Sequence, residues 1–327
     1  MTFRLMSGAL VRRFPDASGQ GIAGRYFSNS IGAAIGVLVS GFVLLPAVGL
    51  PGTVLAAAVL NIALALCVWV LSRQPEWSTS PESRERTSGC DTPAQGTGNG
   101  LPRLLLTVAF ATGAASFIYE IGWIRMLGLG LVLGASTHAF ELMLSAFILG
   151  LALGSAWIRN RIDLLADPIR FLGFVQIAMG VLALATIALY SSAFDLMAGV
   201  IQGLARNENG YAVFNVSSHA IAIMAMLPVR FCAGMTLPLM TNMLLNSDFG
   251  ERSLGQVYAA NTLGAIAGVI AVVHLLLPLL GLNLLMCVGA AIDLGAGAIL
   301  LRRAGVRFLP AWVGASVAIL LMAATLV

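Results

Sequence analysis

Apolar residues in this chain are gathered into long runs that charged residues rarely interrupt. A helix that crosses the ~30 Å hydrocarbon layer of a membrane needs roughly 20 such residues in succession. Runs of that length lie near residues 29–49, 51–72, 104–124, 137–158, 169–191, 215–245, 259–279, 282–301 and 307–327. This pattern predicts an all-α fold, a polytopic transmembrane helix bundle of about nine spans.

One of these runs, 215–245, is longer than a single crossing requires. It contains Pro228, Arg230 and Pro238, and a proline inside a helix removes a backbone hydrogen bond. The sequence therefore predicts a kinked or broken helix here, or one span followed by an interfacial turn. The preceding stretch, 192–214, is mildly amphipathic, and we expect it to rest at the membrane surface.

The polar stretches between the runs divide the chain into five parts. Residues 1–25 form an N-terminal segment without the uninterrupted apolar core of a signal peptide. Residues 73–103 are rich in Ser, Thr, Pro, Gly and charge, so we expect a disordered linker that buries too little apolar area to fold. The helical parts are 26–72, 104–302 and an additional transmembrane helix at 306–327.

Composition narrows the classes of function. Of the 327 residues, 59% are hydrophobic and only 10% are charged, which excludes a soluble globular domain and predicts the lipid bilayer as solvent and partner. All eighteen basic residues are arginine, which excludes lysine Schiff-base chemistry and a Walker-type phosphate loop. The arginines lie between apolar runs and form no basic stripe, so the sequence predicts no nucleic-acid partner.

The arginines also predict the orientation of the chain, because basic residues in short loops are retained on the cytoplasmic side of a membrane. With the N-terminus inside, fifteen of the eighteen arginines lie on that side. The exceptions are Arg125 and Arg206 on the outer side and Arg230 within a span. We therefore expect residues 1–25 and 73–103 to be cytoplasmic.

Cysteine and histidine give little sign of a cofactor. The four cysteines lie far apart and show no C-x-x-C spacing, so neither a metal cluster nor a disulfide framework is predicted. The histidines, His138, His219 and His274, raise the alternative of a haem held between helices. None of them has a second histidine at helical spacing, so we expect no cofactor and no metal.

The chain contains an internal repeat. Residues 26–50 align with residues 258–282 at an offset of 232, and eleven of the twenty-five positions are identical. One period holds six predicted spans, and an even number makes the two copies parallel. The sequence thus predicts a complete six-helix unit at 104–302, preceded at 26–72 by the last two helices of a truncated first copy.

Small residues recur where helices can approach each other closely. Each copy of the repeat has an asparagine one turn before a Gly-x-x-x-Gly pair, and another glycine pair lies in the run at 137–158. The residues predicted to pack helices in this way are Asn29, Gly32, Gly36, Gly150, Gly154, Asn261, Gly264 and Gly268.

Three stretches carry a resemblance to a known family. The first has a Tyr-Glu pair, Trp and Arg within 119–125, followed by Gly-Leu-Ala-Leu-Gly-Ser at 150–155. The others are TLPLM at 236–240 and YAANTLGAIAG at 258–268. Together they resemble the membrane region of the bacterial membrane-integrated, fused transporter-like spermidine-synthase-like family.

The resemblance implies a multi-pass protein of the bacterial inner membrane with a link to polyamines. Members of the family often carry an aminopropyltransferase domain after these helices, with a glycine-rich nucleotide motif and an acidic polyamine pocket. This sequence contains neither motif, so we expect no catalytic residues and no enzyme activity. The parallel six-helix repeat is similar to that of the major facilitator superfamily, an analogy at the level of fold.

Two carboxylates near the outer ends of predicted spans, Glu120 and Glu141, are the first candidate site. Ionisable groups within a membrane usually face the bundle interior and pair with one another. In the functional interpretation they bind a cationic substrate or a proton, with Tyr119 and Trp123 as aromatic walls. In the alternative, Glu120 and Arg125 form a structural pair and the two aromatic residues belong to an interfacial belt.

Arg230 is the deepest arginine in the predicted spans and needs a carboxylate or freed backbone carbonyls as partner. Asp293, a second charge inside an apolar run, is a candidate mate. The sequence leaves open a structural pair or an anion site.

Taken together, these features predict a non-enzymatic, transporter-like membrane module with a small amine or cation as the candidate substrate. Two alternatives stay open: a structural subunit of a larger membrane complex, and a membrane anchor for a separate aminopropyltransferase. The partners expected besides lipid are another membrane subunit or a second copy of the chain.

Overall fold

The structure is a computed structural model that describes residues 18–73, 100–128, 137–203, 208–245 and 252–306. These residues are almost entirely helical and include no strand, which confirms the all-α fold class. The α-helices are α2 (Ser18–Val39), α3 (Leu45–Ser72), α4 (Gly100–Trp123), α5 (Thr137–Arg159), α6 (Pro168–Gly203), α7 (Glu208–Leu245), α8 (Arg252–Ala271) and α9 (Leu277–Arg303). Short π-helices follow three of them, η2 (Ser40–Leu44), η4 (Ile124–Gly128) and η6 (Val272–Leu276), and η5 (Ile162–Leu164) is a 3₁₀ turn.

Six helical stretches of the described chain are long and apolar enough to cross a membrane. They are Gln20–Leu71, Gly100–Leu127, Phe140–Arg159, Pro168–Tyr190, Val216–Leu245 and Leu254–Arg303. The first and the last are 52 and 50 residues long, and each contains two of the spans predicted from sequence. The predicted helix at 306–327 lies almost entirely outside the described residues, so the count of nine spans stays a prediction.

Both long stretches are interrupted in the same way. In each, a π-helix is followed within a few residues by a glycine with positive φ: Gly49 (φ 67°, ψ −178°) after η2 and Gly281 (φ 72°, ψ −172°) after η6. This backbone conformation is nearly restricted to glycine, because a Cβ atom would clash. The two glycines lie 232 residues apart, which is the offset of the sequence repeat.

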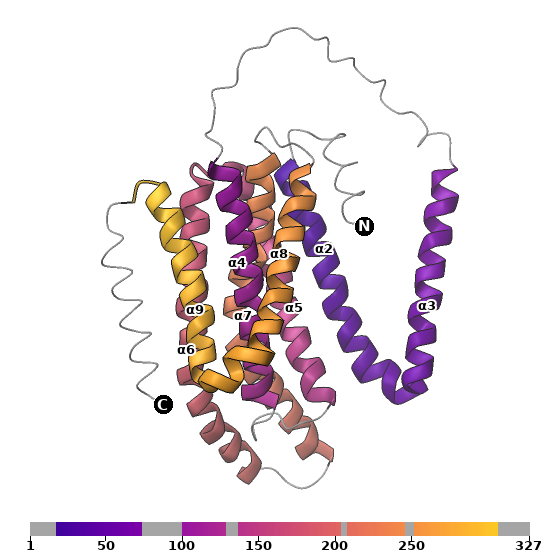
Figure 1. Ribbon diagram of the computed structural model, residues 1–327. Helices are drawn as coiled ribbons and strands as arrows, with labels where there is room; N and C mark the ends of the chain where they lie inside the picture. Colours follow the sequence, from indigo (N-terminus) through magenta and orange to yellow (C-terminus); the bar gives the residue numbers. More distant parts are fainter. Residues whose placement is uncertain (1–17, 74–99, 129–136, 204–207, 246–251, 307–327) are drawn as a thin grey trace. The chain divides into compact units, whose positions relative to one another are not determined.

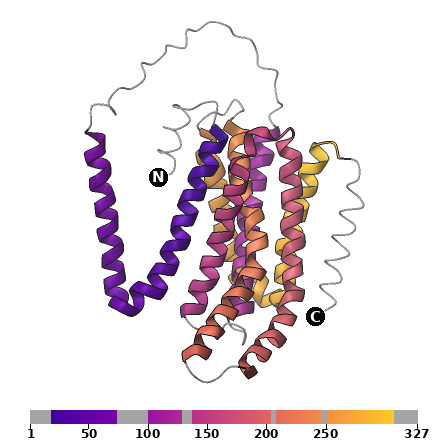
Figure 2. The same cartoon turned by 180° about the vertical axis from the view of Figure 1, so that it is seen from behind.

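The chain separates into two compact units, residues 38–100 and the remainder. In the second of these, α4 to α9 run alongside one another as a helix bundle in both views (Figures 1 and 2). Helix α7 packs against α5 and α6, and α6 also packs along α9. The chain reverses direction between α8 and α9, at η6 and Gly281.

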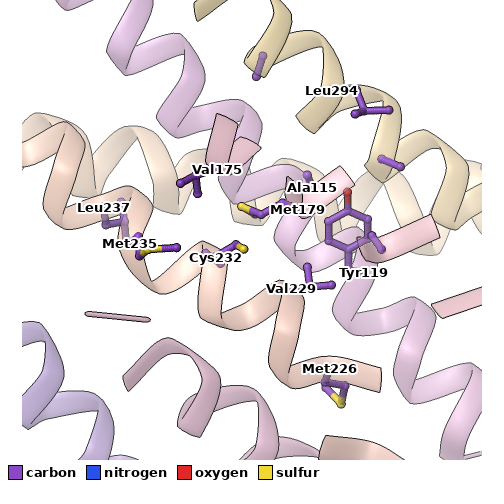
Figure 3. Packing of buried hydrophobic residues seen from close by; sticks show 14 of the residues in the cluster. Ala115, Tyr119, Val175, Met179, Met226, Val229, Cys232, Met235, Leu237 and Leu294 are labelled. Atoms are coloured by element: carbon purple, nitrogen blue, oxygen red, sulfur yellow. The ribbon is translucent and has the colours of Figure 1, made fainter. Parts of the chain in front are cut away.

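Helix α7 provides the centre of the core. A larger share of it is buried than of any other membrane-length stretch in the described chain. Figure 3 shows Met226, Val229, Cys232, Met235 and Leu237 along this helix, among apolar side chains of α4, α6 and α9. These residues belong to one continuous apolar core.

The run at 215–245 is not broken. Helix α7 is continuous from Glu208 to Leu245, with Pro228 and Pro238 inside it. This corrects the prediction of a broken helix or an interfacial turn. Helix α7 packs against α5 and α6, and a transmembrane helix tolerates prolines where neighbouring helices support it.

Helix ends differ from the limits of the apolar runs. Helix α2 already begins at Ser18, before the boundary at 26, and α4 begins at Gly100, inside the predicted linker. Helices α6 and α7 also extend into 192–214, the stretch expected at the membrane surface. An apolar run marks only the part that needs apolar side chains, whereas helical hydrogen bonds continue into polar residues. Residues 74–99 of the linker lie outside the described part.

Candidate charged site in the helix bundle

Glycines bring α5 and α7 together at the point where Arg230 lies. A Cβ atom at Gly150 would lie 2.5 Å from the Cβ of Arg230, and one at Gly154 would overlap the carbonyl oxygen of Phe231. From the other helix, a Cβ at Gly234 would overlap the carbonyl oxygen of Leu151. The two backbones therefore approach as only small residues allow, and this contact fixes where the side chain of Arg230 begins.

The side chain of Arg230 is enclosed, with 1% of its surface exposed. Its guanidinium carbon lies 3.7 Å from the ring centroid of Phe147 on α5 and 5.1 Å from that of Trp123 on α4. One terminal nitrogen donates a hydrogen bond to the carbonyl oxygen of Ser116 at 2.8 Å, whereas Nε has no partner. Aromatic faces and a backbone carbonyl thus stabilise this charge, and within the described residues no carboxylate forms a salt bridge with it.

Asp293 on α9 is fully buried and accepts its hydrogen bond from α4. The hydroxyl of Tyr119 donates to Oδ2 at 2.9 Å, while Oδ1 has no partner. A Cβ at Gly289 would lie 2.6 Å from the Tyr119 ring, so this glycine makes room for the tyrosine. Figure 3 shows the hydroxyl of Tyr119 pointing toward the helix that carries Leu294. Tyr119, rather than Arg230, is therefore the hydrogen-bond partner of Asp293.

Glu120 follows Tyr119 on α4 but lies at a different surface. It is partly exposed and borders a small, shallow hollow that is open to the surface. The other residues around this hollow are Ile124, Phe140, Met143, Leu144, Phe147 and Met226. Phe147 thus contacts both the hollow and the guanidinium of Arg230. A carboxylate beside two phenylalanine rings is a setting that suits a small organic cation.

Electrostatic interactions join the three charged residues. Arg230 interacts with Glu120 and with Asp293 at longer range than a hydrogen bond. One cation and two carboxylates carry a net charge of −1 when all three are ionised. An unbalanced charge inside an apolar bundle is unfavourable, so a bound cation or a proton would stabilise the set.

The aromatic residues of the motif lie inside the bundle. The rings of Tyr119 and Trp123 stack with their centroids 5.7 Å apart, and the indole nitrogen of Trp123 donates to Thr186 at 3.2 Å. Both side chains are buried, so they do not line an outer aromatic belt in this structure.

Other candidate residues lie elsewhere. Arg125 is exposed in η4, and Glu141 is partly exposed on α5 without lining the hollow beside Glu120. Sequence reasoning did not single out Thr112 and Gln176, whose side chains form a hydrogen bond between α4 and α6. A lone amide within an apolar run is the signal that would have drawn attention to Gln176.

The predicted packing residues divide between the two copies of the repeat. On α8, a Cβ at Gly264 would overlap the carbonyl oxygen of Phe110, and one at Gly268 would lie 2.7 Å from that of Ala114. A Cβ at Gly113, a residue that the sequence did not single out, would likewise overlap the carbonyl oxygen of Asn261. The equivalent residues on α2 are Asn29, Gly32 and Gly36, which are exposed, and a Cβ at either glycine would meet no described atom within 4 Å.

The structure describes the side chains of two of the three histidines, and these belong to no metal cluster. His219 is partly buried with Nδ1 unpartnered, and His274 is exposed. The side chain of His138 lies outside the described ones. Among the side chains that are described, no three of His, Cys, Asp or Glu are placed to hold a metal ion.

Comparison with protein-family models, curated proteins and solved structures finds no match to this chain. The family resemblance therefore stays a prediction from the sequence motifs, and the function has to be argued from the charged site itself.

Proposed function

We propose that this chain is a non-enzymatic, transporter-like membrane module that binds a small cation, with amines as the preferred class, beside Glu120. The observation that carries the proposal is the placement of Glu120 at the rim of a hollow, within electrostatic reach of Arg230. With Asp293 they form a set of three groups that would carry a net charge of −1 with all of them ionised. A cation in the hollow would neutralise that charge, and Phe140 and Phe147 would contact an alkylammonium group through their ring faces.

The shared irregularities support a repeated architecture. The π-helices η2 and η6 and the positive-φ glycines Gly49 and Gly281 recur at the offset of the sequence repeat. A backbone pattern this rare is expected to recur when two segments descend from one unit. We therefore propose that segments 26–72 and 258–303 are copies, and that each contributes two spans to a total of nine.

The proposed location is the bacterial inner membrane with the N-terminus in the cytoplasm. The apolar helices support a membrane location, and the distribution of fifteen arginines supports the orientation. Labelling of Cys90 by an impermeant periplasmic reagent in intact cells would contradict this orientation.

Calorimetric titration of the protein in nanodiscs with methylammonium and with spermidine tests the binding site. The variants are Glu120→Gln and, as matched control on a carboxylate that does not border the hollow, Glu141→Gln. We expect Glu120→Gln to weaken binding by at least about tenfold, because a charged contact contributes ~1.5 kcal/mol or more. Equal affinity of both variants and the wild type, or no binding by the wild type, would contradict the proposal.

A structural subunit remains the second candidate, because of one residue in α3. Asn61 is an exposed amide in the middle of an apolar helix, 232 positions before the buried Asp293. Amides within membranes usually bond to a neighbouring helix. Crosslinking from Cys67, six residues further along α3, would capture such a partner, and the absence of any crosslinked chain in native membranes would count against this role.

A further inference from the structure

We propose that Asp293 is a proton-binding site coupled through Arg230 to the cation site at Glu120, so that binding of a monovalent cation releases one proton. This inference rests on the proposed function and adds the identity of the coupling ion. It concerns a residue on α9 that does not border the hollow.

The hydrogen bonds of Asp293 suit a carboxyl group that gains and loses a proton. The residue is 0% exposed, Oδ2 accepts a hydrogen bond from Tyr119, and Oδ1 has no partner. A fully buried carboxylate with one hydrogen bond is unfavourable, and a proton on Oδ1 removes the charge. Tyr119 keeps its own proton and donates to Oδ2 in both states.

The surroundings of Asp293 leave Arg230 as the group that can balance its charge. On α4, Asp293 contacts Tyr119, with Glu120 next in sequence. On α7, Asp293 interacts electrostatically with Arg230 and with the thiol of Cys232. Helix α6 has no ionisable side chain between Arg170 and Tyr190, and Cys287 is the nearest such group before Asp293 on α9 itself.

Charge balance then links the two sites. Without a bound cation, the positive charge of Arg230 balances that of Glu120, and Asp293 is neutral with its proton on Oδ1. When a monovalent cation occupies the hollow, it balances Glu120, and Arg230 is available to balance ionised Asp293. The proton leaves Oδ1 for the solvent, and the net charge of the buried set stays at zero in both states. By linkage, the cation and the proton compete for the protein even though they bind to different residues.

The experiment measures protons released when the full chain in nanodiscs binds methylammonium. Titrations in two buffers of equal pH but different ionisation enthalpy give the number of protons per bound cation. We expect about one for the wild type, and affinity that rises about tenfold per pH unit while Asp293 is protonated in the free protein. For Asp293→Asn, which keeps the Tyr119 hydrogen bond, we expect binding with no proton release.

The outcomes separate this inference from the proposed function. Proton release by Asp293→Asn equal to that of the wild type would overturn the inference while leaving the cation site intact. If the wild type does not bind methylammonium, or if Glu120→Gln binds it as tightly as the wild type, the proposed function and the inference with it would be overturned. The pH dependence of wild-type affinity is a test that needs no variant, and binding that is independent of pH with no proton released would also overturn the coupling.

Discussion

The hydroxyl of Tyr119 on α4 donates a hydrogen bond across 2.9 Å to the carboxylate of Asp293 on α9, a residue 174 positions later in the chain. Both side chains are fully buried. Gly289, one turn before Asp293, lies against the Tyr119 ring, so the hydrogen bond and the close contact position α4 against α9 together.

Replacing Tyr119 by phenylalanine should destabilise the bundle. The substitution leaves both oxygens of Asp293 without a protein donor, so we expect the free energy of unfolding to fall by about 1–3 kcal/mol. Unfolding in mixed micelles titrated with SDS, followed by tryptophan fluorescence, measures this loss. Tyr26→Phe is the matched control, since it is Tyr119 that donates the hydrogen bond to Asp293, and an equal effect of both changes would show that this bond does not stabilise the fold.

The repeat provides a matched pair of glycine substitutions. Gly264→Ala should destabilise the protein, because the new Cβ would overlap the carbonyl oxygen of Phe110 and push α8 away from α4. Gly32→Ala, at the equivalent position of α2, meets no described atom within 4 Å and should be neutral or stabilising by up to ~1 kcal/mol. Midpoints of thermal unfolding in detergent compare the two variants, and equal midpoints would contradict the close α4–α8 contact.

The kink inside α9 depends on the conformation of Gly281. Its φ of 72° strains any residue with a Cβ, so Gly281→Ala should cost about 1–3 kcal/mol even though no described atom lies within 4 Å of the added methyl group. Gly295→Ala in the same helix also meets open space, but at an ordinary helical position, and should not destabilise. We expect the same SDS titration to separate the two variants, and a harmless Gly281→Ala would be at odds with the reversed chain direction at this residue.

The fold class follows from the sequence because the membrane imposes it. In a run of about 20 apolar residues within a membrane, a helix is the simplest way to pair the backbone N–H and C=O groups, and the described chain is indeed helical. The course of α7 was harder to predict, since prolines predict a break only when no neighbouring helix supports the backbone. Glycine motifs also predict a close contact only where a neighbouring helix is present. Gly32 and Gly264 lie in equivalent motifs, but in the described chain only Gly264 faces another helix.

The candidate site was predictable in part. Arg230 and Asp293 stand out in sequence because charges are rare in long apolar runs. Tyr119 was singled out as an aromatic wall, but its hydrogen bond to Asp293 was not predicted, nor was that of Arg230 to Ser116, because both depend on how distant helices cross. The role of Phe147 as a wall shared by Arg230 and the hollow likewise depends on the α5–α7 contact.

Uptake of radiolabelled methylammonium into proteoliposomes tests the central claim most directly, since it asks whether the carboxylate at the hollow handles a cation. We expect uptake by the wild type above that of protein-free liposomes, a fall to that background for Glu120→Gln, and retained uptake for Glu141→Gln. Uptake by Glu120→Gln equal to that of the wild type, or no uptake by the wild type above the background, would contradict the account.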